Sequence, residues 1–249
     1  MILSNSRPLV TFLFACTTLL AGCHPPGKPG PEPEVVRPEQ VLDFPTLYGQ
    51  NCAACHGANG KSGAAISLAN PVYLAIAGKQ NIVRITSEGV PNTAMPPFGR
   101  SKGGMLTDAQ ISVIADGMQQ AWGNASALGG QTPPAYSNTG TGNAANGQKA
   151  FATYCAQCHG VDGASGKLPS GQSLGSLVDP AYLALVSDQG LRSIILAGQF
   201  DKTPHDWRSY PVSGGAPAKP ITDQDVTDIV AWLASQRIAT PGQPYATKP

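Results

Sequence analysis

Two pentapeptides constrain this chain more than any other feature: CAACH at residues 52–56 and CAQCH at residues 155–159. Both follow the Cys-x-x-Cys-His pattern of haem c attachment. On a helix, positions i, i+3 and i+4 lie on one face, so two sulfurs and one imidazole reach the same side. The thiols can then bond to the two vinyl groups of one porphyrin while the histidine takes an axial site on its iron. The predicted attachment residues are Cys52, Cys55, Cys155 and Cys158, and the predicted axial ligands are His56 and His159.

Two other uses of paired cysteines fit the sequence less well. A redox-active Cys-x-x-Cys belongs near a βαβ pattern, and no such pattern surrounds either pentapeptide. A structural zinc ion needs four ligands in a tetrahedron. Each pentapeptide offers three crowded residues without an obvious fourth. The same Cys-x-x-Cys-His spacing occurs twice in the chain, which favours haem attachment over these two uses.

On these pentapeptides the chain resembles the diheme class I c-type cytochromes, in which two small cytochrome c domains stand in tandem. The resemblance extends from Glu39 to Arg237. It implies an all-α fold, with a few short helices and long loops around a covalent haem in each domain. Two covalently bound haem c groups are the implied cofactors. Each domain is small for an apolar core, and a large flat apolar group in its middle eases that problem.

The first residues predict export and a lipid anchor. Arg7 precedes an apolar run, residues 9–20, that is typical of a secretory leader and too short for a comfortable membrane span. The leader ends in Leu-Ala-Gly-Cys at residues 20–23, which resembles the bacterial lipobox, so Cys23 is the expected lipidation site. The alternatives are a leader cut near Ala21 and an uncleaved anchor. Several acyl chains on Cys23 would hold the protein stably at a membrane.

Composition divides the chain into six segments. They are a lipoprotein signal peptide at 1–22, a proline-rich tether at 23–38, a first cytochrome c domain at 39–123, a flexible linker at 124–143, a second domain at 144–240 and a C-terminal tail at 241–249. The linker is mostly Gly, Ser, Thr, Asn and Pro, with almost nothing to bury. No disulfide is needed, because four cysteines serve haem, Cys16 lies in the leader and Cys23 carries lipid.

Capping residues and apolar spacing predict matching helices in the two domains. The expected N-caps are Asp43, Asn70 and Thr107 in the first domain and Asn146, Asp179 and Thr222 in the second. Gly57 is expected to end the first attachment helix in a left-handed conformation. The closing helices carry apolar residues at the spacing of a core stripe, namely Ile111, Ile114, Ala115 and Met118, then Val226, Ile229, Val230 and Leu233.

Met95 is the predicted sixth ligand of the first haem iron. In c-type cytochromes a thioether sulfur usually completes the iron, and the segment around Met95 matches the Met-ligand loop of the family. Flanking prolines stiffen this loop and direct the sulfur. The rivals are Met105, beside two glycines, and Met118, on the core stripe. Alternatively, the Met95 side chain only packs against its neighbours and binds no iron.

The second domain contains no methionine, so its sixth ligand must differ from that of the first. His205 is the spare histidine of that half, and it falls one residue past the place where Met95 sits, counted from Gly198 and Gly89. The sequence therefore predicts His205 as the ligand. An open site, Lys202 and Tyr210 are the alternatives.

The resemblance implies a one-electron carrier more than an enzyme. Its partners would be a redox protein donor and acceptor, membrane complexes of a respiratory or photosynthetic chain, on the outer, periplasmic side of a bacterial membrane. A net charge of +1 argues against nucleic acid, whose binding proteins present a basic face. The missing second methionine motivates a diheme peroxidase-like enzyme as the alternative. A cytochrome subunit bound permanently to a dehydrogenase or oxidase complex is a third reading.

Overall fold

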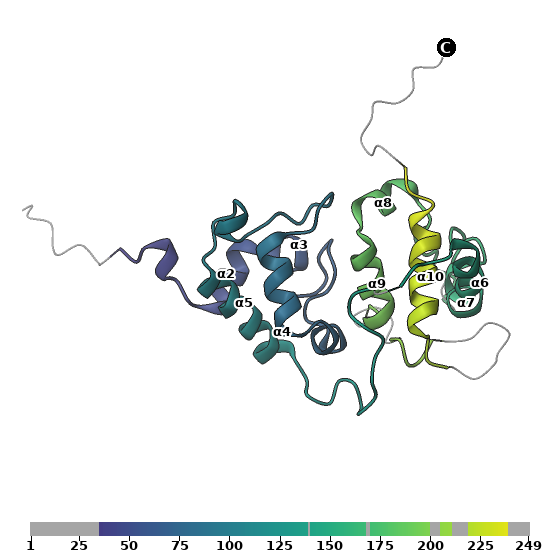
Figure 1. Ribbon diagram of the computed structural model, residues 1–249, viewed down its shortest axis with the longest axis horizontal. Helices are drawn as coiled ribbons and strands as arrows, with labels where there is room; N and C mark the ends of the chain where they lie inside the picture. Colours follow the sequence, from purple (N-terminus) through teal and green to yellow (C-terminus); the bar gives the residue numbers. More distant parts are fainter. Residues whose placement is uncertain (1–34, 139, 168–169, 200–204, 211–218, 239–249) are drawn as a thin grey trace, which may run out of the picture. The chain divides into compact units, whose positions relative to one another are not determined.

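The computed structural model describes residues 35–138, 140–167, 170–199, 205–210 and 219–238 (Figure 1). Within these residues the structure is helical, with two isolated β-bridges and no strand, so the predicted all-α fold is confirmed. Among the described helices none combines the length and apolarity needed to cross a membrane. Residues 39–249 belong to one compact unit, and residues 1–38 are separate from it. The signal peptide, Cys23, Lys202 and the tail at 241–249 lie outside the described residues.

The first domain holds four α-helices and two short 3-10 helices. In chain order they are η1 Pro38–Gln40, α2 Phe44–Asn51, α3 Ala53–His56, α4 Pro71–Glu88, η2 Arg100–Lys102 and α5 Asp108–Trp122. The three predicted caps are present, because the side chains of Asp43, Asn70 and Thr107 each accept a bond from a first-turn backbone N–H. Helix α4 is kinked at Gly78, whose φ of 65° and ψ of 161° are not helical.

The described residues of the second domain form five α-helices in a similar order, with α8 and α9 in place of the kinked α4. They are α6 Ala144–Tyr154, α7 Ala156–His159, α8 Pro180–Leu185, α9 Asp188–Ala197 and α10 Asp223–Ala234. Asp179 and Thr222 cap α8 and α10 as predicted. The predicted cap Asn146 is wrong: Asn143 caps α6, and its side chain accepts from the backbone N–H of Asn146. The N-cap of α6 therefore lies three residues earlier in the chain than the sequence predicted.

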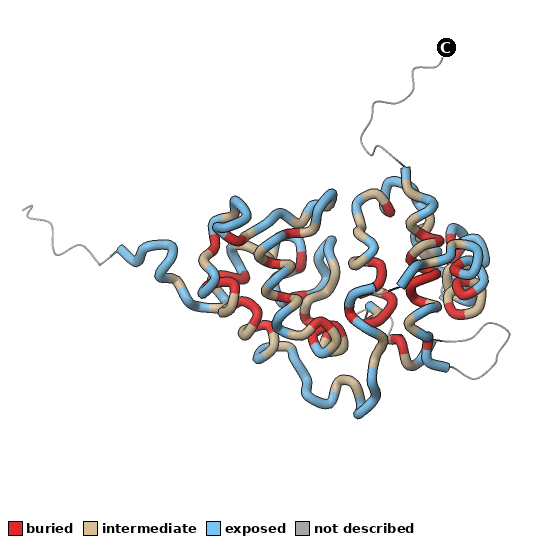
Figure 2. Tube along the Cα trace, in the orientation of Figure 1, coloured by how far each residue is buried: buried red, intermediate tan, exposed pale blue. Residues whose placement is uncertain are grey.

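A large residue opposite a glycine sets the crossing of the first and last helices in each domain. In the first domain, the ring of Phe44 on α2 lies against Gly117 on α5. In the second, the order is reversed, and Gly147 on α6 faces Trp232 and the backbone of α10. The bulky side chain thus comes from the first helix in one domain and from the last helix in the other, so the packed volume between the two helices stays similar. Figure 2 shows buried segments along α5 and α10, and all eight residues of the predicted core stripes are buried.

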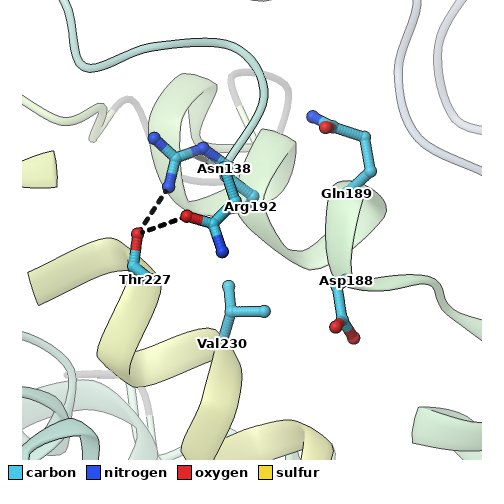
Figure 3. Close-up of a pocket in the computed structure, with 6 residues that line it drawn as sticks. All are labelled: Asn138, Asp188, Gln189, Arg192, Thr227 and Val230. Atoms are coloured by element: carbon cyan, nitrogen blue, oxygen red, sulfur yellow. Dashed lines mark hydrogen bonds between the residues drawn. The ribbon is translucent and has the colours of Figure 1, made fainter. Parts of the chain in front are cut away.

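The linker is anchored at Tyr136, an exception to the expectation that it buries almost nothing. Tyr136 is buried, and its ring makes a T-shaped contact with Tyr73 at 6.4 Å between centroids. The buried Arg192 of α9 donates from Nε to the Tyr136 carbonyl at 3.2 Å. Figure 3 shows the Thr227 hydroxyl of α10 hydrogen-bonded to both Arg192 and Asn138. A buried guanidinium requires such partners, so Arg192 fastens the linker to the second domain.

The two halves of the chain also touch directly through the start of α4. The side-chain amide of Asn70 donates to the carbonyls of Ala197, at 2.9 Å, and Gly198, at 3.1 Å. Val72 and Ile76, one turn apart on α4, pack against the core of the second half. Asn70 therefore has two functions, because its oxygen caps α4 while its nitrogen joins α4 to the end of α9.

Gly147→Ala tests the helix crossing of the second domain. The added Cβ would collide with the backbone carbonyl of Asp228, and such overpacking should lower the free energy of unfolding by about 1–3 kcal/mol. Gly49→Ala in α2 is the matched control, since nothing lies within 4 Å of its Cβ. It should be neutral or stabilising by up to about 1 kcal/mol. Denaturant unfolding of the haem-loaded protein, followed by circular dichroism, measures both, and equal stabilities would contradict this packing.

Candidate haem sites

Each pentapeptide folds into its own four-residue helix, α3 or α7, directly after a longer helix. The backbone N–H of His56 donates to the Cys52 carbonyl, and that of His159 to the Cys155 carbonyl, both at 3.0 Å. The preceding helix breaks at the first cysteine, with φ of −120° at Cys52 and −117° at Cys155. Two cysteines and one histidine therefore share a single helical turn at each site.

A glycine with positive φ ends each attachment helix. Gly57 has φ 82° and ψ 151°, and Gly160 has φ 74° and ψ 156°. The predicted left-handed helical conformation at Gly57 is wrong in ψ, which is extended. The residue must still be glycine, because a Cβ there would collide with the carbonyl of Lys61. The Gly57 carbonyl accepts from the hydroxyl of Tyr48 at 2.9 Å, which holds the loop against α2.

A backbone carbonyl holds the imidazole of His56 in one orientation. Its Nδ1 lies 2.8 Å from the carbonyl of Ile66, so Nδ1 carries the proton and Nε2 keeps its lone pair. Burial lowers the pKa of His56, against a smaller upward effect of the hydrogen bond to Ile66. Burial also lowers the pKa of His159. Both rings are therefore neutral at pH 7, which is the form that binds a metal.

The first thiol of each pentapeptide lies in apolar surroundings. Burial raises the pKa of Cys52 to about 11, and the nearby Cys55 adds to the effect. Burial raises the pKa of Cys155 to about 12, with a further contribution from Cys158. Redox-active pairs show the opposite, a lowered thiol pKa. These cysteines thus fit attachment to an apolar group better than thiol exchange.

The residues present fit a covalent haem. Ligating histidines usually donate their second ring N–H to an oxygen, as His56 does to Ile66. In the described part of the second domain, two buried nitrogens have no hydrogen-bond partner, Nδ1 of His159 and Nε1 of Trp207. Buried donors require an acceptor, and a bound group with carboxylates, such as haem, would supply one for Trp207. The pocket of Figure 3 is separate, since none of the pentapeptide residues lines it.

Met95 lies in a loop that folds back onto the end of α4. Its carbonyl accepts from the backbone N–H of Val90 at 3.0 Å, and its own N–H donates to Thr93 Oγ1 at 3.2 Å. A Cβ on Gly89 would lie only 2.8 Å from the Met95 carbonyl oxygen. Glycine at the end of α4 therefore permits the close return of this loop, and the Met95 side chain remains half-buried.

The two rival methionines have other environments. Met105 is 81% exposed to solvent, and Met118 is 2% exposed within the protein core of the first domain. An exposed sulfur is not held for a metal, and one enclosed by core side chains already has packing partners. Met95 stays the predicted ligand of the first iron.

The loop of His205 follows the same plan at the end of α9. A Cβ on Gly198 would collide with the His205 carbonyl, just as one on Gly89 would approach the Pro96–Pro97 peptide. Two residues later, the carbonyl of Trp207 accepts from Ile221 at 2.8 Å, as that of Phe98 accepts from Leu106 at 2.8 Å. His205 is thus the structural counterpart of Pro96, the residue after Met95.

Tyr210, an alternative ligand of the second iron, has another role in this structure. Its hydroxyl donates to the carbonyl of Ile195 at 2.7 Å. Burial raises the pKa of Tyr210, and the charges of Cys155 and Asp206 add to the rise. The hydroxyl of Tyr210 is thus already engaged in holding this segment against α9. His205 is half-buried and remains the predicted ligand.

Sequence reasoning missed two contributors to these sites. The Ile66 carbonyl orients His56 from ten residues away, and a backbone acceptor leaves no mark in the residue type. Trp207 could have been found, because a large apolar residue in a loop, two residues after His205, suggests a buried position.

Both halves of the chain match known families. Residues 144–237 match the family described as Cytochrome c, and residues 39–116 match Cytochrome C oxidase, cbb3-type, subunit III. Each matched segment contains one Cys-x-x-Cys-His pentapeptide. Two covalently bound haem c groups are therefore the cofactors of this chain.

A curated relative and a solved structure are also similar to the chain. The cbb3-type cytochrome c oxidase subunit CcoP of Azospirillum sp. (strain B510) is 29% identical over 154 residues, which are 55% of this chain and 47% of that protein. The match thus spans about half of the relative. The reducing HAO-like protein complex Kustc0457/Kustc0458 of Kuenenia stuttgartiensis aligns over 83% of this chain and 99% of that one, at 16% identity and a TM-score of 0.40. At this TM-score the structural likeness supports no conclusion.

Substitution of the two loop residues tests iron ligation. Met95→Ala should abolish the methionine–iron charge-transfer band of the oxidised protein, because the thioether is lost. His205→Ala should keep that band and open the second haem to carbon monoxide. Met105→Ala, at an exposed methionine, is the control and should change neither signal. Ready binding of carbon monoxide by the unsubstituted second haem would contradict ligation by His205.

Proposed function

We propose that this chain, a diheme c-type cytochrome, transfers single electrons between redox partners on the outer face of a bacterial cytoplasmic membrane. The observation that carries the proposal is the duplicated attachment turn. In both copies the histidine backbone N–H donates to the carbonyl of the first cysteine, a glycine ends the turn, and the helical core is built mainly from the copy's own domain. Two such domains in one chain suit passage of an electron through the protein better than a single redox centre would.

The chain contributes binding, orientation and burial. Bound haem supplies one-electron chemistry through its iron, with a potential set by axial ligands and surroundings. Ile66 holds His56 in one tautomer and one orientation. Met95 in the first domain and His205 in the second are the proposed sixth ligands, and a thioether raises the potential relative to a second imidazole. The first domain would then be the higher-potential centre.

The buried polar groups of the described helices are engaged in structure: Arg192 with the linker, Thr227 with Arg192 and the helix backbone, and Asp228 with the start of α6. Electron transfer requires no acid, base or nucleophile. The proposed electron transfer therefore needs only the haem site of each domain.

A fixed oxidase subunit is the second candidate. The likeness to a CcoP subunit and the match of residues 39–116 to a cbb3-type subunit III favour it. In this candidate the electron acceptor would be the terminal oxidase complex itself. It differs from the free carrier in the lifetime of the association, and both use the same two haem domains.

The proposed anchor places these domains at the membrane surface. Cys23 follows three small or apolar residues of lipobox type, and the segment 23–38 is rich in proline. A proline-rich segment is semi-extended and acts as a spacer. Lipid on Cys23 would thus keep the cytochrome domains near membrane complexes while letting them reorient.

A reductive titration tests the electron-transfer function. The purified protein should take up two electrons per chain in separate one-electron steps, because each domain holds one haem. It should also reduce hydrogen peroxide no faster than an equal amount of a monohaem cytochrome c. Rapid turnover of peroxide would favour the peroxidase-like alternative, and uptake of one electron would contradict two haem sites.

Cys23→Ser tests the lipid anchor. The unsubstituted protein should fractionate with membranes and carry diacylglycerol on residue 23, as mass spectrometry of the mature N-terminus would show. The variant should appear in the soluble exported fraction or stay unprocessed, with its haem content unchanged. An unsubstituted protein that is cleaved elsewhere and washes off membranes with buffer would refute the anchor.

A further inference from the structure

The start of α4 in the first domain is covered by the second domain. Asn70 is 1% exposed and donates to the carbonyls of Ala197 and Gly198 at the end of α9. Tyr73 is 7% exposed against the linker ring of Tyr136. Ile76, one turn further, packs on the second core. This helix face is thus an interface in which one small haem domain receives another.

The same face exists a second time, on α8 of the second domain, and there it is open. The sequence Asn-Pro-Val-Tyr-Leu-Ala-Ile at residues 70–76 corresponds to Asp-Pro-Ala-Tyr-Leu-Ala-Leu at residues 179–185. We call Asp179, Ala181, Tyr182 and Leu185 the α8 face. Tyr182 is 37% exposed and Leu185 is 62% exposed, whereas Leu183 between them is fully buried. Solvent therefore meets an apolar surface whose counterpart is covered in the first domain.

The chain after α10 is fastened to the end of α8. Arg237 donates to the carbonyls of Leu183, at 2.9 Å, and Val186, at 2.7 Å, which ties the chain after α10 to the end of α8. The next residue, Ile238, is 42% exposed. Tyr182 and Leu185 are exposed apolar residues one turn apart on α8, and grouped residues of this kind mark interaction sites more often than single ones do.

One substitution between the two faces indicates the chemistry of the partner. Asn70 offers an N–H to the carbonyls that end α9, and its counterpart Asp179 offers only carboxylate oxygens. A helix end with free carbonyls would be repelled by Asp179. In a second copy, the corresponding helix end would also bring Glu88 to this place, because Glu88 is the counterpart of Ala197. The α8 face therefore disfavours such a helix end of its own chain and favours a partner with a cation or an N–H donor opposite Asp179.

We propose that the α8 face is the docking surface for a haem domain of a redox partner protein, which presents an apolar patch with a lysine or arginine opposite Asp179. The identity of the partner as a redox protein rests on the proposed electron-transfer function. The geometry rests on the covered counterpart in the first domain. The face is small, and small interfaces are typical of brief encounters between electron-transfer proteins.

Binding to a defined probe tests this surface without relying on electron transfer. The probe is a purified monohaem cytochrome c with a strongly basic surface, labelled with nitrogen-15, and both proteins are kept oxidised. Titration with the full haem-loaded chain should shift amide signals of the probe and yield a Kd. Leu185→Ser should raise this Kd about five- to tenfold, as expected for one apolar side chain. Asp179→Asn should raise the Kd at low salt and reduce its salt dependence.

Both variants are chosen to leave the fold intact. Leu185 is largely exposed, and asparagine caps helices as well as aspartate does and stands at the equivalent position in the first domain. Met105→Ser is the matched control, an exposed apolar residue of the other domain, and should leave the Kd unchanged. An acidic monohaem cytochrome c as probe should bind more weakly.

Several outcomes would overturn the proposal. They are an unchanged Kd in both α8 variants, an equal loss in Met105→Ser, no binding of the basic probe, and self-association of the chain that Leu185→Ser abolishes. Each is separate from a failure of electron transfer, which the reductive titration detects without any partner. A chain that takes up two electrons but shows one of these outcomes keeps its function and loses this docking surface.

Discussion

The single helical turn from Cys52 to His56, repeated from Cys155 to His159, is the constraint on which the rest of the structure depends. It holds two cysteines and one histidine within five residues of backbone. A turn so short has little stability of its own, because helix formation has a costly nucleus. The longer helix before it, the glycine after it and the folded-back loop therefore all serve to hold the turn.

Each domain supports its attachment turn with the crossing of its first and last helices. Phe44 against Gly117 and Gly147 against Trp232 are two solutions to one packing requirement. Since the bulky side chain changes helix between the domains, the space between the helices is conserved while the residues are not. This explains how two halves with few shared core residues present the same turn in the same setting.

The two domains are also unequal in ways that matter for their function. The first uses α4 to meet its neighbour, and the second leaves the equivalent α8 face open. The linker between them is fixed by the hydrogen bond from Arg192 to the Tyr136 carbonyl, although its composition is mostly polar. The loops after α4 and α9 are fastened to their helices at equivalent points. The first loop carries a methionine, and the second carries a histidine one residue past the equivalent position.

The sequence by itself determined the class of cofactor, the helical fold, most caps and both core stripes, because each depends on spacing along one helix. Asp43, Asn70, Thr107, Asp179 and Thr222 behave as their residue types predict. Only the tertiary structure decided the rest. The cap at Asn143, the orientation of His56 by Ile66, the burial of Tyr136 and the opposite exposures of Tyr73 and Tyr182 all depend on contacts between distant segments. Such contacts are formed by backbone groups and neighbouring domains, and the local pattern of residues does not encode them.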